Sequence, residues 1–431
     1  MKKINVGLLG FGNVGQGVIK ILSERKSFLG HKIGVEINIQ KVCDKDTSYK
    51  RKVSLERIYF SKDAKEIIHD PQIDIIVELI GGIHPAKEYI AEALKKGKSV
   101  VTANKALLAQ EGRELFALAE DRGKSICFEA SVGAGIPIIK SLREGLVANK
   151  FYSIFGIVNG TSNFILSQMS QNNLSFNDAL SQAKARGFAE KDPSLDIEGI
   201  DSAHKLILLN YLCFGRLVRL EDIFIEGISC VSLADINYAQ ELGFAIKLLA
   251  IAKKESAELE LRVHPTLIPK AHLLSSVSGI FNAIYVSSDL AGNLLFYGPG
   301  AGQLSAASAV VSDLVDLTQG LKAGMFRPTL NIVADKSIKR LRRINEIESR
   351  YYIRFMAVDK PGVLAKISGV LAKFRISIAS VTQKERRKAQ VVPIVMIIHE
   401  AKEKDLRSAL EIIDRLDIIR QKSVAIRIEE L

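Results

Sequence analysis

Apolar and polar residues alternate in long blocks along the first third of the chain. The segment 4–22 begins as a continuous apolar run, passes through a glycine-rich turn and ends with apolar residues at helical spacing. Further apolar runs, at 35–42, 73–82 and 98–109, end in small or polar residues. Runs of this kind predict strands buried on both faces of a parallel sheet. We therefore expect an α/β, Rossmann-type domain that binds ligands at the carboxyl ends of its strands.

The middle of the chain predicts a different sheet. Residues 125–142 indicate a strand, a glycine-rich turn and a helix begun by proline. A mixed sheet with helices on one face is then expected, with strands at the start of 151–166 and near 222–231, 259–267 and 280–288. The segment 296–317 predicts a glycine-rich turn that leads into a long Ala/Val helix.

The last part of the chain follows a third pattern. Residues 321–350 are irregular and then polar, which indicates a linker with little of its own to bury. From residue 351 onward the predicted order is strand, helix, strand, strand, helix, strand. That βαββαβ order is typical of a ferredoxin-like domain.

Residues 10–15 read Gly-Phe-Gly-Asn-Val-Gly between the first predicted strand and helix, the setting that a dinucleotide fingerprint requires. The glycines permit a tight turn and close approach to a pyrophosphate, and the helix N-terminus favours the anion. The residues concerned are Gly10, Phe11, Gly12, Asn13, Val14 and Gly15. Asp44, at the end of the second strand, is the natural candidate to bind the ribose 2′-hydroxyl, and the alternative is that it is a turn residue. An aspartate there favours NAD, whereas Lys41, Lys45 and the basic run 50–52 could accept NADP.

Acidic residues and helix breakers gather between Ala183 and Lys205, so much of this stretch is expected to be loop. After Gly199 the apolar spacing becomes helical, which places Asp201 in the first turn of a helix and Lys205 in the second. The simple interpretation is an exposed i,i+4 ion pair, worth about 0.3–0.5 kcal/mol.

The spacing A-x3-G-F-A-x2-D-P-x2-D-I-x-G-x-D-x3-K over 183–205 resembles the signature of homoserine dehydrogenases without a gap. The resemblance implies NAD(P)H-dependent reduction of L-aspartate 4-semialdehyde to L-homoserine, on the route to threonine, methionine and isoleucine. It implies that Lys205 is the catalytic acid/base with Asp196 as its electrostatic companion, and that Lys105 is a second lysine of the site. Glu190 and Asp201 would hold the substrate.

The same resemblance extends to the cofactor and a cation. It implies that Gly81, Thr102, Lys105 and Gly300 lie beside the nicotinamide. It also implies a monovalent cation, Na⁺, at Glu129 and the main-chain carbonyls of Val132, Ala134 and Ile136. The expected domains are a dinucleotide-binding domain over 1–130 completed by about 298–320, a substrate and dimerisation domain over 131–297, the linker, and a regulatory domain over 351–431.

The turn Asp359-x-Pro361-Gly362 makes the C-terminal domain resemble an ACT domain, a module that binds amino acids. A turn at a helix N-terminus can bind a carboxylate, and Asp359 can bind an ammonium. We therefore expect an amino-acid effector, threonine most plausibly. The alternative is that the domain only pairs with its copy to hold a dimer together.

Composition limits the other functions. The chain has 431 residues, 47% hydrophobic and 25% charged, as in an ordinary globular protein. Its net charge of +12 comes from scattered lysines and arginines, with one dense run at 384–388, so we expect no nucleic-acid partner. The four cysteines are far apart, so we expect neither a zinc site nor a disulfide framework. No apolar run reaches the length of a membrane span, and we expect a soluble protein that is not exported and has no membrane partner. We expect a cytoplasmic protein with reduced cysteine thiols. We also expect a homodimer or homotetramer.

Two alternatives remain at this stage. One is another NAD(P)-dependent amino-acid dehydrogenase, which should lack the Asp196 to Lys205 spacing. The other is a sensor of nicotinamide and amino acid that has no turnover. An assay with NADPH and aspartate semialdehyde separates all three.

Overall fold

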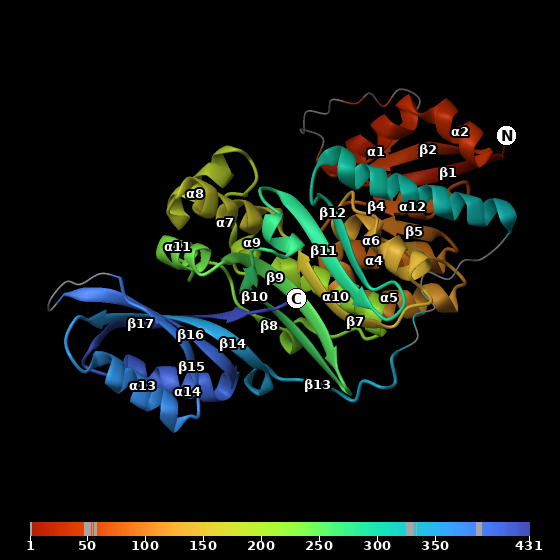
Figure 1. The fold of residues 1–431 in the computed structure, drawn as a ribbon. Helices are drawn as coiled ribbons and strands as arrows, with labels where there is room; N and C mark the ends of the chain where they lie inside the picture. The colour runs from red at the N-terminus through yellow and green to blue at the C-terminus, as the bar shows by residue number, and fades with distance from the viewer. Residues whose placement is uncertain are drawn as a thin grey trace. The chain divides into compact units, whose positions relative to one another are not determined.

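The computed structural model describes residues 2–46, 53, 55, 58–324, 332, 334–384 and 390–431. The chain divides into two compact units (Figure 1). The first, here the cofactor unit, comprises 1–154, 203–222 and 281–336; the second, the substrate unit, comprises 155–202, 223–280 and 337–431. Strand β7 (Phe151–Ile157) and helix α10 (Ile200–Phe214) each run from one unit into the other.

The cofactor unit is built on a six-stranded parallel sheet in the order β3-β2-β1-β4-β5-β6. Its strands are β1 (Lys2–Leu9), β2 (Val35–Cys43), β3 (Tyr59–Ser61), β4 (Ile75–Glu78), β5 (Ser99–Thr102) and β6 (Ile126–Cys127). Its first helices are α1 (Asn13–Glu24), α2 (Lys26–Ile33), α3 (Ala64–Ile68), α4 (Ala86–Lys95) and α5 (Lys105–Asp121). Reversal of strand order at β1 confirms the predicted Rossmann-type domain.

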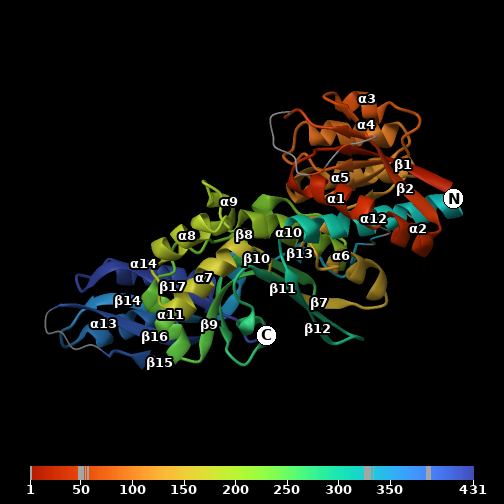
Figure 2. The same cartoon turned by 90° about the horizontal axis from the view of Figure 1, so that it is seen from above.

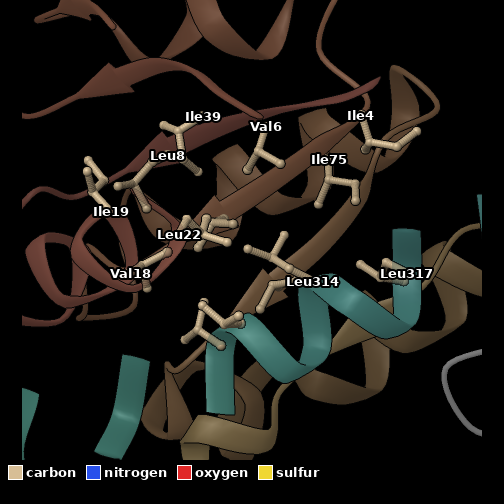
Figure 3. Packing of buried hydrophobic residues seen from close by; sticks show 14 of the residues in the cluster. Ile4, Val6, Leu8, Val18, Ile19, Leu22, Ile39, Ile75, Leu314 and Leu317 are labelled. Atoms are coloured by element: carbon tan, nitrogen blue, oxygen red, sulfur yellow. The ribbon is translucent and has the colours of Figure 1, made fainter. Parts of the chain in front are cut away.

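Alternate residues of β1 face opposite layers of helices. Ile4, Val6 and Leu8 are buried in a cluster with α1 and the distant helix α12 (Gln303–Ala323) (Figure 3). Gly7 faces the other way, where a Cβ would lie 2.3 Å from a methyl of Ile67 in α3. Helices therefore cover both faces of the sheet, as Figure 2 shows.

The same unit contains the segments that follow β6. These are η1 (Glu129–Ser131), α6 (Ile138–Lys140), η2 (Ser141–Gly145), η3 (Leu220–Asp222), and the antiparallel pair β11 (Phe281–Ser288) and β12 (Asn293–Pro299). Helix α12 follows β12 and packs along α1, so a segment far along the chain from the first strands covers the sheet.

The substrate unit contains strands in the order β9-β10-β17-β14-β16-β15. Before the C-terminal domain its elements are α7 (Gly160–Asn172), α8 (Phe176–Ala185), α9 (Ser194–Ile197), β8 (Phe224–Ile225), α11 (Leu233–Glu241), β9 (Phe244–Glu255), β10 (Glu258–Pro269), η4 (Leu273–Ser276), β13 (Arg340–Leu341) and η5 (Ile344–Glu346). Within the described ranges, no helix combines the length and apolar character that a membrane span requires.

The C-terminal domain has the predicted βαββαβ order. Its elements are β14 (Glu348–Val358), α13 (Val363–Lys373), β15 (Ile378–Thr382), β16 (Val391–Lys402), α14 (Glu403–Asp414) and β17 (Ile419–Ile428). Both helices lie on one face of the sheet (Figure 1), where Ile367, Ile413 and Phe355 belong to one buried cluster.

Three predictions about elements were wrong or incomplete. Residues 222–231 form only the short strand β8, and strand β9 was missed because its run FAIKLLAIA is apolar without a clear period. Part of the expected linker packs against β9 and β10 rather than being solvated, since Ile338 and Ile347 are buried. Arg342 pairs there with Glu255, Glu258 and Glu260 at 2.6–2.7 Å. Of the basic run at 384–388, only Lys384 lies within the described residues.

Candidate active site

The glycine-rich turn has the geometry that the fingerprint predicts. Gly10 has φ +97°, and a Cβ on it would lie 2.5 Å from the Leu79 carbonyl oxygen. A Cβ on Gly15 would lie 2.4 Å from the Gly10 oxygen. Helix α1 begins with Gly12 as its N-cap and has no acidic residue in its first turn, so its first N–H groups suit an anion.

Asp44 contacts the fingerprint itself. Its Oδ2 accepts the Phe11 N–H at 2.8 Å and its Oδ1 accepts the Asp46 N–H at 3.0 Å. The carboxylate thus fixes the turn while staying half-buried at the end of β2. Lys41, which could attract a 2′-phosphate, pairs with Asp70 at 3.0 Å. The basic run 50–52 lies outside the described residues.

A buried glutamate organises the next two strand ends. Glu78 Oε1 accepts the Ile80 N–H at 2.7 Å and the Gly81 N–H at 3.2 Å, and its Oε2 accepts the Thr102 hydroxyl at 2.6 Å. Thr102 Oγ1 in turn accepts the Asn104 N–H at 3.0 Å.

Asn104 connects these strand ends to Lys105, the predicted second lysine of the site. Its side chain caps α5 by accepting the Leu107 N–H at 3.2 Å and donates to the Gly82 carbonyl at 2.6 Å. Lys105 is the first residue of α5 and is half-buried. The helix begins after the strand end as predicted, and neither Glu78 nor Asn104 was singled out from the sequence.

Three glycine-rich turns meet in the cofactor unit. A Cβ on Gly17 would lie 2.9 Å from the Ala307 Cβ, and Gln303 donates to the Asn13 carbonyl at 2.9 Å. The turn 133–135 packs on the first turn of α12, which follows the turn 300–302, because a Cβ on Gly135 would lie 3.3 Å from the Ser305 Cβ. The turn that carries Gly300 therefore lies in the same unit as the fingerprint, as the resemblance implies.

The predicted cation segment is arranged around Glu129. Its two carboxylate oxygens accept the N–H groups of Ile139 and Lys140, each at 2.8 Å, and its own N–H donates to Asp313 at 2.9 Å. Burial raises the pKa of Glu129, and burial raises that of Asp313 far more. Ala134 has φ +47°, an uncommon value for a residue with a Cβ. In the described ranges no group of three or more His, Cys, Asp or Glu side chains is arranged to hold a metal.

Helix α10 carries both Asp201 and Lys205, in its first and second turns as predicted. Each is only 8% exposed. An exposed ion pair is therefore the wrong interpretation, because charges are seldom buried to this degree without a structural or functional reason.

Asn159 brings two of the predicted carboxylates together. Its amide Nδ2 donates to Asp196 at 2.6 Å and to Asp201 at 2.9 Å, and Thr161 donates to the other oxygen of Asp196 at 2.9 Å. Asn159 also caps α7 by accepting the Ser162 N–H at 2.8 Å. The sequence Asn-Gly-Thr after an apolar strand was the available signal, and it was not interpreted.

The remaining predicted residues are more exposed. Glu190 lies exposed in the loop before α9. Asp196 belongs to α9 itself, so the expectation that its backbone would be irregular is wrong. In the C-terminal domain Gly362 caps α13 with φ +86°, and Pro361 is exposed. Asp359 Oδ2 is buried and has no hydrogen-bond partner among the described residues.

The Rossmann-type sheet, the buried lysine and the paired carboxylates define a nicotinamide-dependent dehydrogenase joined to a ferredoxin-like domain. The sequence matches the family model described as homoserine dehydrogenase over 137–315, the model of its NAD binding domain over 10–129, and the ACT domain model over 351–417. The chain belongs to the homoserine dehydrogenase family.

Individual relatives agree. The homoserine dehydrogenase of Neisseria gonorrhoeae is 42% identical over 100% of both chains. The crystal structure of a homoserine dehydrogenase from Thiobacillus denitrificans matches with TM-score 0.93 and 42% identity, covering 100% of this chain and 99% of that one. A hyperthermophilic archaeal homoserine dehydrogenase in complex with NADPH matches with TM-score 0.64 and 28% identity, covering 75% of this chain and 100% of that one. The predicted family is confirmed. The protein is an oxidoreductase acting on a CH–OH group, and it interconverts aspartate semialdehyde and homoserine with a nicotinamide cofactor.

Proposed function

We propose that Lys205 is the acid/base of this reaction with Asp196 as its electrostatic companion, and that Glu190 and Asp201 hold the substrate's ammonium. Because Asn159 joins Asp196 to Asp201, we propose in addition that Asp196 faces the same ammonium. The observation that carries the proposal is the Asn159 side chain, which donates to both Asp196 and Asp201. Asp201 lies four residues before Lys205 on α10. Two carboxylates that accept one amide keep lone pairs for an ammonium. Lys105 would assist by stabilising negative charge on the substrate oxygen.

A bound reduced nicotinamide would supply the hydride to the aldehyde carbon. The C=O electron pair then moves to oxygen, and Lys205 donates a proton to it. An ordinary lysine has a pKa of about 10.4 and is charged at neutral pH, so it suits reduction, whereas homoserine oxidation needs the neutral amine. Oxidation should therefore become faster in alkali.

Lys205→Ala tests the assignment. Loss of a general acid should lower kcat by about 10²–10⁴-fold while leaving the affinity for NADPH, measured by fluorescence titration, unchanged. A variant that keeps more than about half of the wild-type rate overturns the role of Lys205. Lys191→Ala, an exposed lysine of the preceding loop, is the control.

The cofactor preference is proposed as NADP with appreciable use of NAD. The family member in complex with NADPH supports NADP, and Asp44 at the end of β2 supports NAD. A Na⁺ ion at Glu129 is proposed from the resemblance, with the carbonyls of Val132, Ala134 and Ile136. Assays in K⁺-, Na⁺- and choline-based buffers test it, since an unchanged rate in choline argues against a required cation.

The ACT domain is proposed to bind threonine at Asp359, Pro361 and Gly362 and to lower activity. The unpartnered Asp359 oxygen and the first N–H groups of α13 support an amino-acid ligand. Calorimetric titration of threonine with the full chain and with Asp359→Asn tests it. Heat that is absent from both excludes threonine. A cytoplasmic homodimer or homotetramer completes the proposal, and light scattering measures the assembly.

A further inference from the structure

The stretch 190–199, here called the substrate loop, packs on the turn 226–228, which follows β8 and is here called the β8 turn. Two glycines make this close contact possible. A Cβ on Gly227 would lie 2.5 Å from the Ile197 carbonyl oxygen, and a Cβ on Gly199 would lie 3.1 Å from a methyl of Val263. The Ile228 N–H donates to the same Ile197 oxygen at 2.8 Å. The turn therefore fixes the end of α9, one residue after Asp196.

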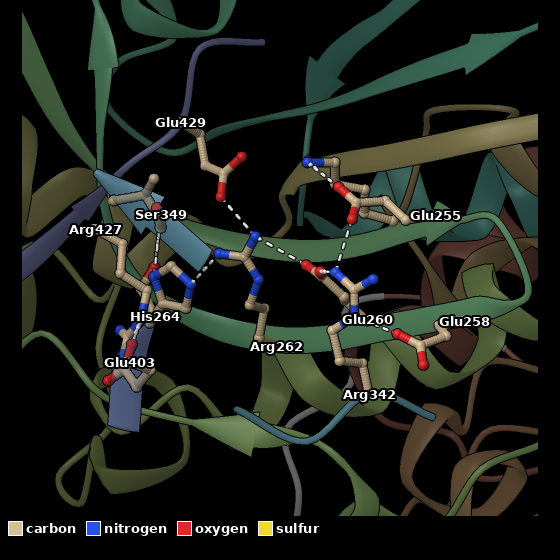
Figure 4. Close-up of polar contacts among 12 residues, drawn as sticks. Glu255, Glu258, Glu260, Arg262, His264, Arg342, Ser349, Glu403, Arg427 and Glu429 are labelled. Carbon is tan, nitrogen blue, oxygen red and sulfur yellow. Dashed lines mark hydrogen bonds and ion pairs between the residues drawn. The ribbon is translucent and has the colours of Figure 1, made fainter. Parts of the chain in front are cut away.

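The same turn is held from the other side by the ACT domain. Glu226 Oε2 accepts Nη1 of Arg427, a residue of β17, at 3.1 Å. Arg427 is only 3% exposed, and its other donors bind both oxygens of Glu403 at 2.6 and 2.8 Å (Figure 4). Its guanidinium also lies 4.7 Å from the ring centroid of Phe224 in β8.

The main chain supports this connection. Strand β10 pairs with β8 through Val263 and Ile225, and with β17 through Thr266 and Arg427. The Glu226 N–H donates to the Val263 carbonyl at 2.8 Å. Strand β10 thus pairs with both β8, which precedes the turn, and β17, which contains Arg427.

We infer that Arg427 and Glu226 are positioning residues for the reaction: an arginine of the ACT domain sets Asp196 through the β8 turn. The inference rests on the proposed role of Asp196 in binding substrate. Arg427 binds both oxygens of Glu403, which also pairs with Arg407, so Arg427 keeps a buried carboxylate beside it when Glu226 is neutralised. The effect of the Glu226 contact is instead to fix where the turn meets Ile197.

Glu226→Gln tests the inference without removing the arginine. It keeps the side-chain shape and leaves Arg427 paired with Glu403, so the chain should fold normally. A coupling of this kind should raise KM for aspartate semialdehyde about threefold to thirtyfold, with KM for NADPH and the melting temperature unchanged. Glu221→Gln, which removes an exposed partner of Arg219 beside the same strand, should change nothing.

Gly227→Ala provides an independent variant. Its Cβ must displace Ile197, so KM for the semialdehyde should rise as in Glu226→Gln, and the double variant should show less than the sum of the two effects. Gly369→Ala, a helical glycine of α13 with open space around it, is the control. If Asp196→Asn raises KM but Glu226→Gln and Gly227→Ala do not, the coupling is wrong. If Asp196→Asn leaves KM unchanged, the proposed substrate site itself is wrong and the inference fails with it.

Discussion

Asn159 has two separate duties, and one substitution can separate them. The side-chain oxygen Oδ1 caps α7 by accepting the Ser162 N–H, and the side-chain NH₂ group donates to both Asp196 and Asp201. Serine is an equally good N-cap but has no amide to reach both carboxylates. Asn159→Ser should therefore keep the melting temperature within a few degrees and lower kcat/KM for the semialdehyde about tenfold to a hundredfold, as expected for lost hydrogen bonds to charged groups.

The matched control for that variant is a cap without a site. Ser175 caps α8 by accepting the Asp178 N–H and is exposed, so Ser175→Ala should lower stability slightly with normal kinetics. Steady-state kinetics and thermal unfolding of both variants decide the matter. Equal kinetic losses in the two would mean that Asn159 acts only through helix stability.

Asp44 gives a second prediction at the scale of one residue. Its carboxylate both fixes the Phe11 N–H and carries the negative charge that opposes a 2′-phosphate. Asp44→Ser should raise the ratio of kcat/KM for NADP over NAD about tenfold. Asp63→Ser, which makes the same substitution at the N-cap of α3 in the same domain, should leave the ratio unchanged. An unchanged ratio in Asp44→Ser would mean that the carboxylate does not face the ribose.

At the scale of elements, sequence patterns predicted what is local and missed what is distant. The strand, turn and helix at 4–22 and the start of α10 follow from glycine positions and helical spacing, which neighbouring residues encode. Asn159 lies 37 residues from Asp196, and Glu226 lies 201 residues from Arg427. No period in the sequence reports such pairs, because tertiary packing creates them. Strand β9 was missed for the related reason that both its faces are buried.

Strand β9 also contains a buried cation whose charge opposes folding. Lys247 is 5% exposed, its side chain reaches the Val277 carbonyl, and burial lowers its pKa to about 8. The folded state thus binds fewer protons than the unfolded chain between about pH 8 and the ordinary value of 10.5. Its contribution to stability should become more favourable as pH rises through this window.

Lys247→Met measures this contribution. Between pH 7.5 and 9.5 the free energy of unfolding of the wild type should rise by about 2 kcal/mol relative to that of the variant. Urea unfolding of both proteins at the two pH values gives the difference, in which the other titrating groups cancel. A difference of zero, or one of the opposite sign, would contradict a lowered pKa for Lys247.

At the scale of the whole chain, the ACT domain is built into the substrate unit rather than attached to it. Arg262 of β10 is 1% exposed and donates to Glu429 at 2.6 Å (Figure 4). Burial and the nearby Arg427 and Arg262 keep the pKa of His264 well below its usual value, so the neutral ring accepts from Arg262 at 3.0 Å. Arg354 of β14 pairs with the fully buried Asp235 of α11 at 2.7 Å.

A chain shortened to end at Lys336 should therefore lose more than regulation. It would expose the edge of β10 that pairs with β17, and it would remove Glu429 from Arg262 and Arg354 from Asp235. An unpaired strand edge is a site of aggregation. We expect the shortened chain to unfold at a much lower temperature and to aggregate, with low activity whether or not threonine is present. Glu429→Gln keeps the domain but leaves Arg262 with Glu260 as its charged partner, at the longer distance of 3.3 Å and shared with Arg342, so this variant should lie between the two in melting temperature. A shortened chain as stable and as active as the full one would show that these buried pairs do not support the substrate unit.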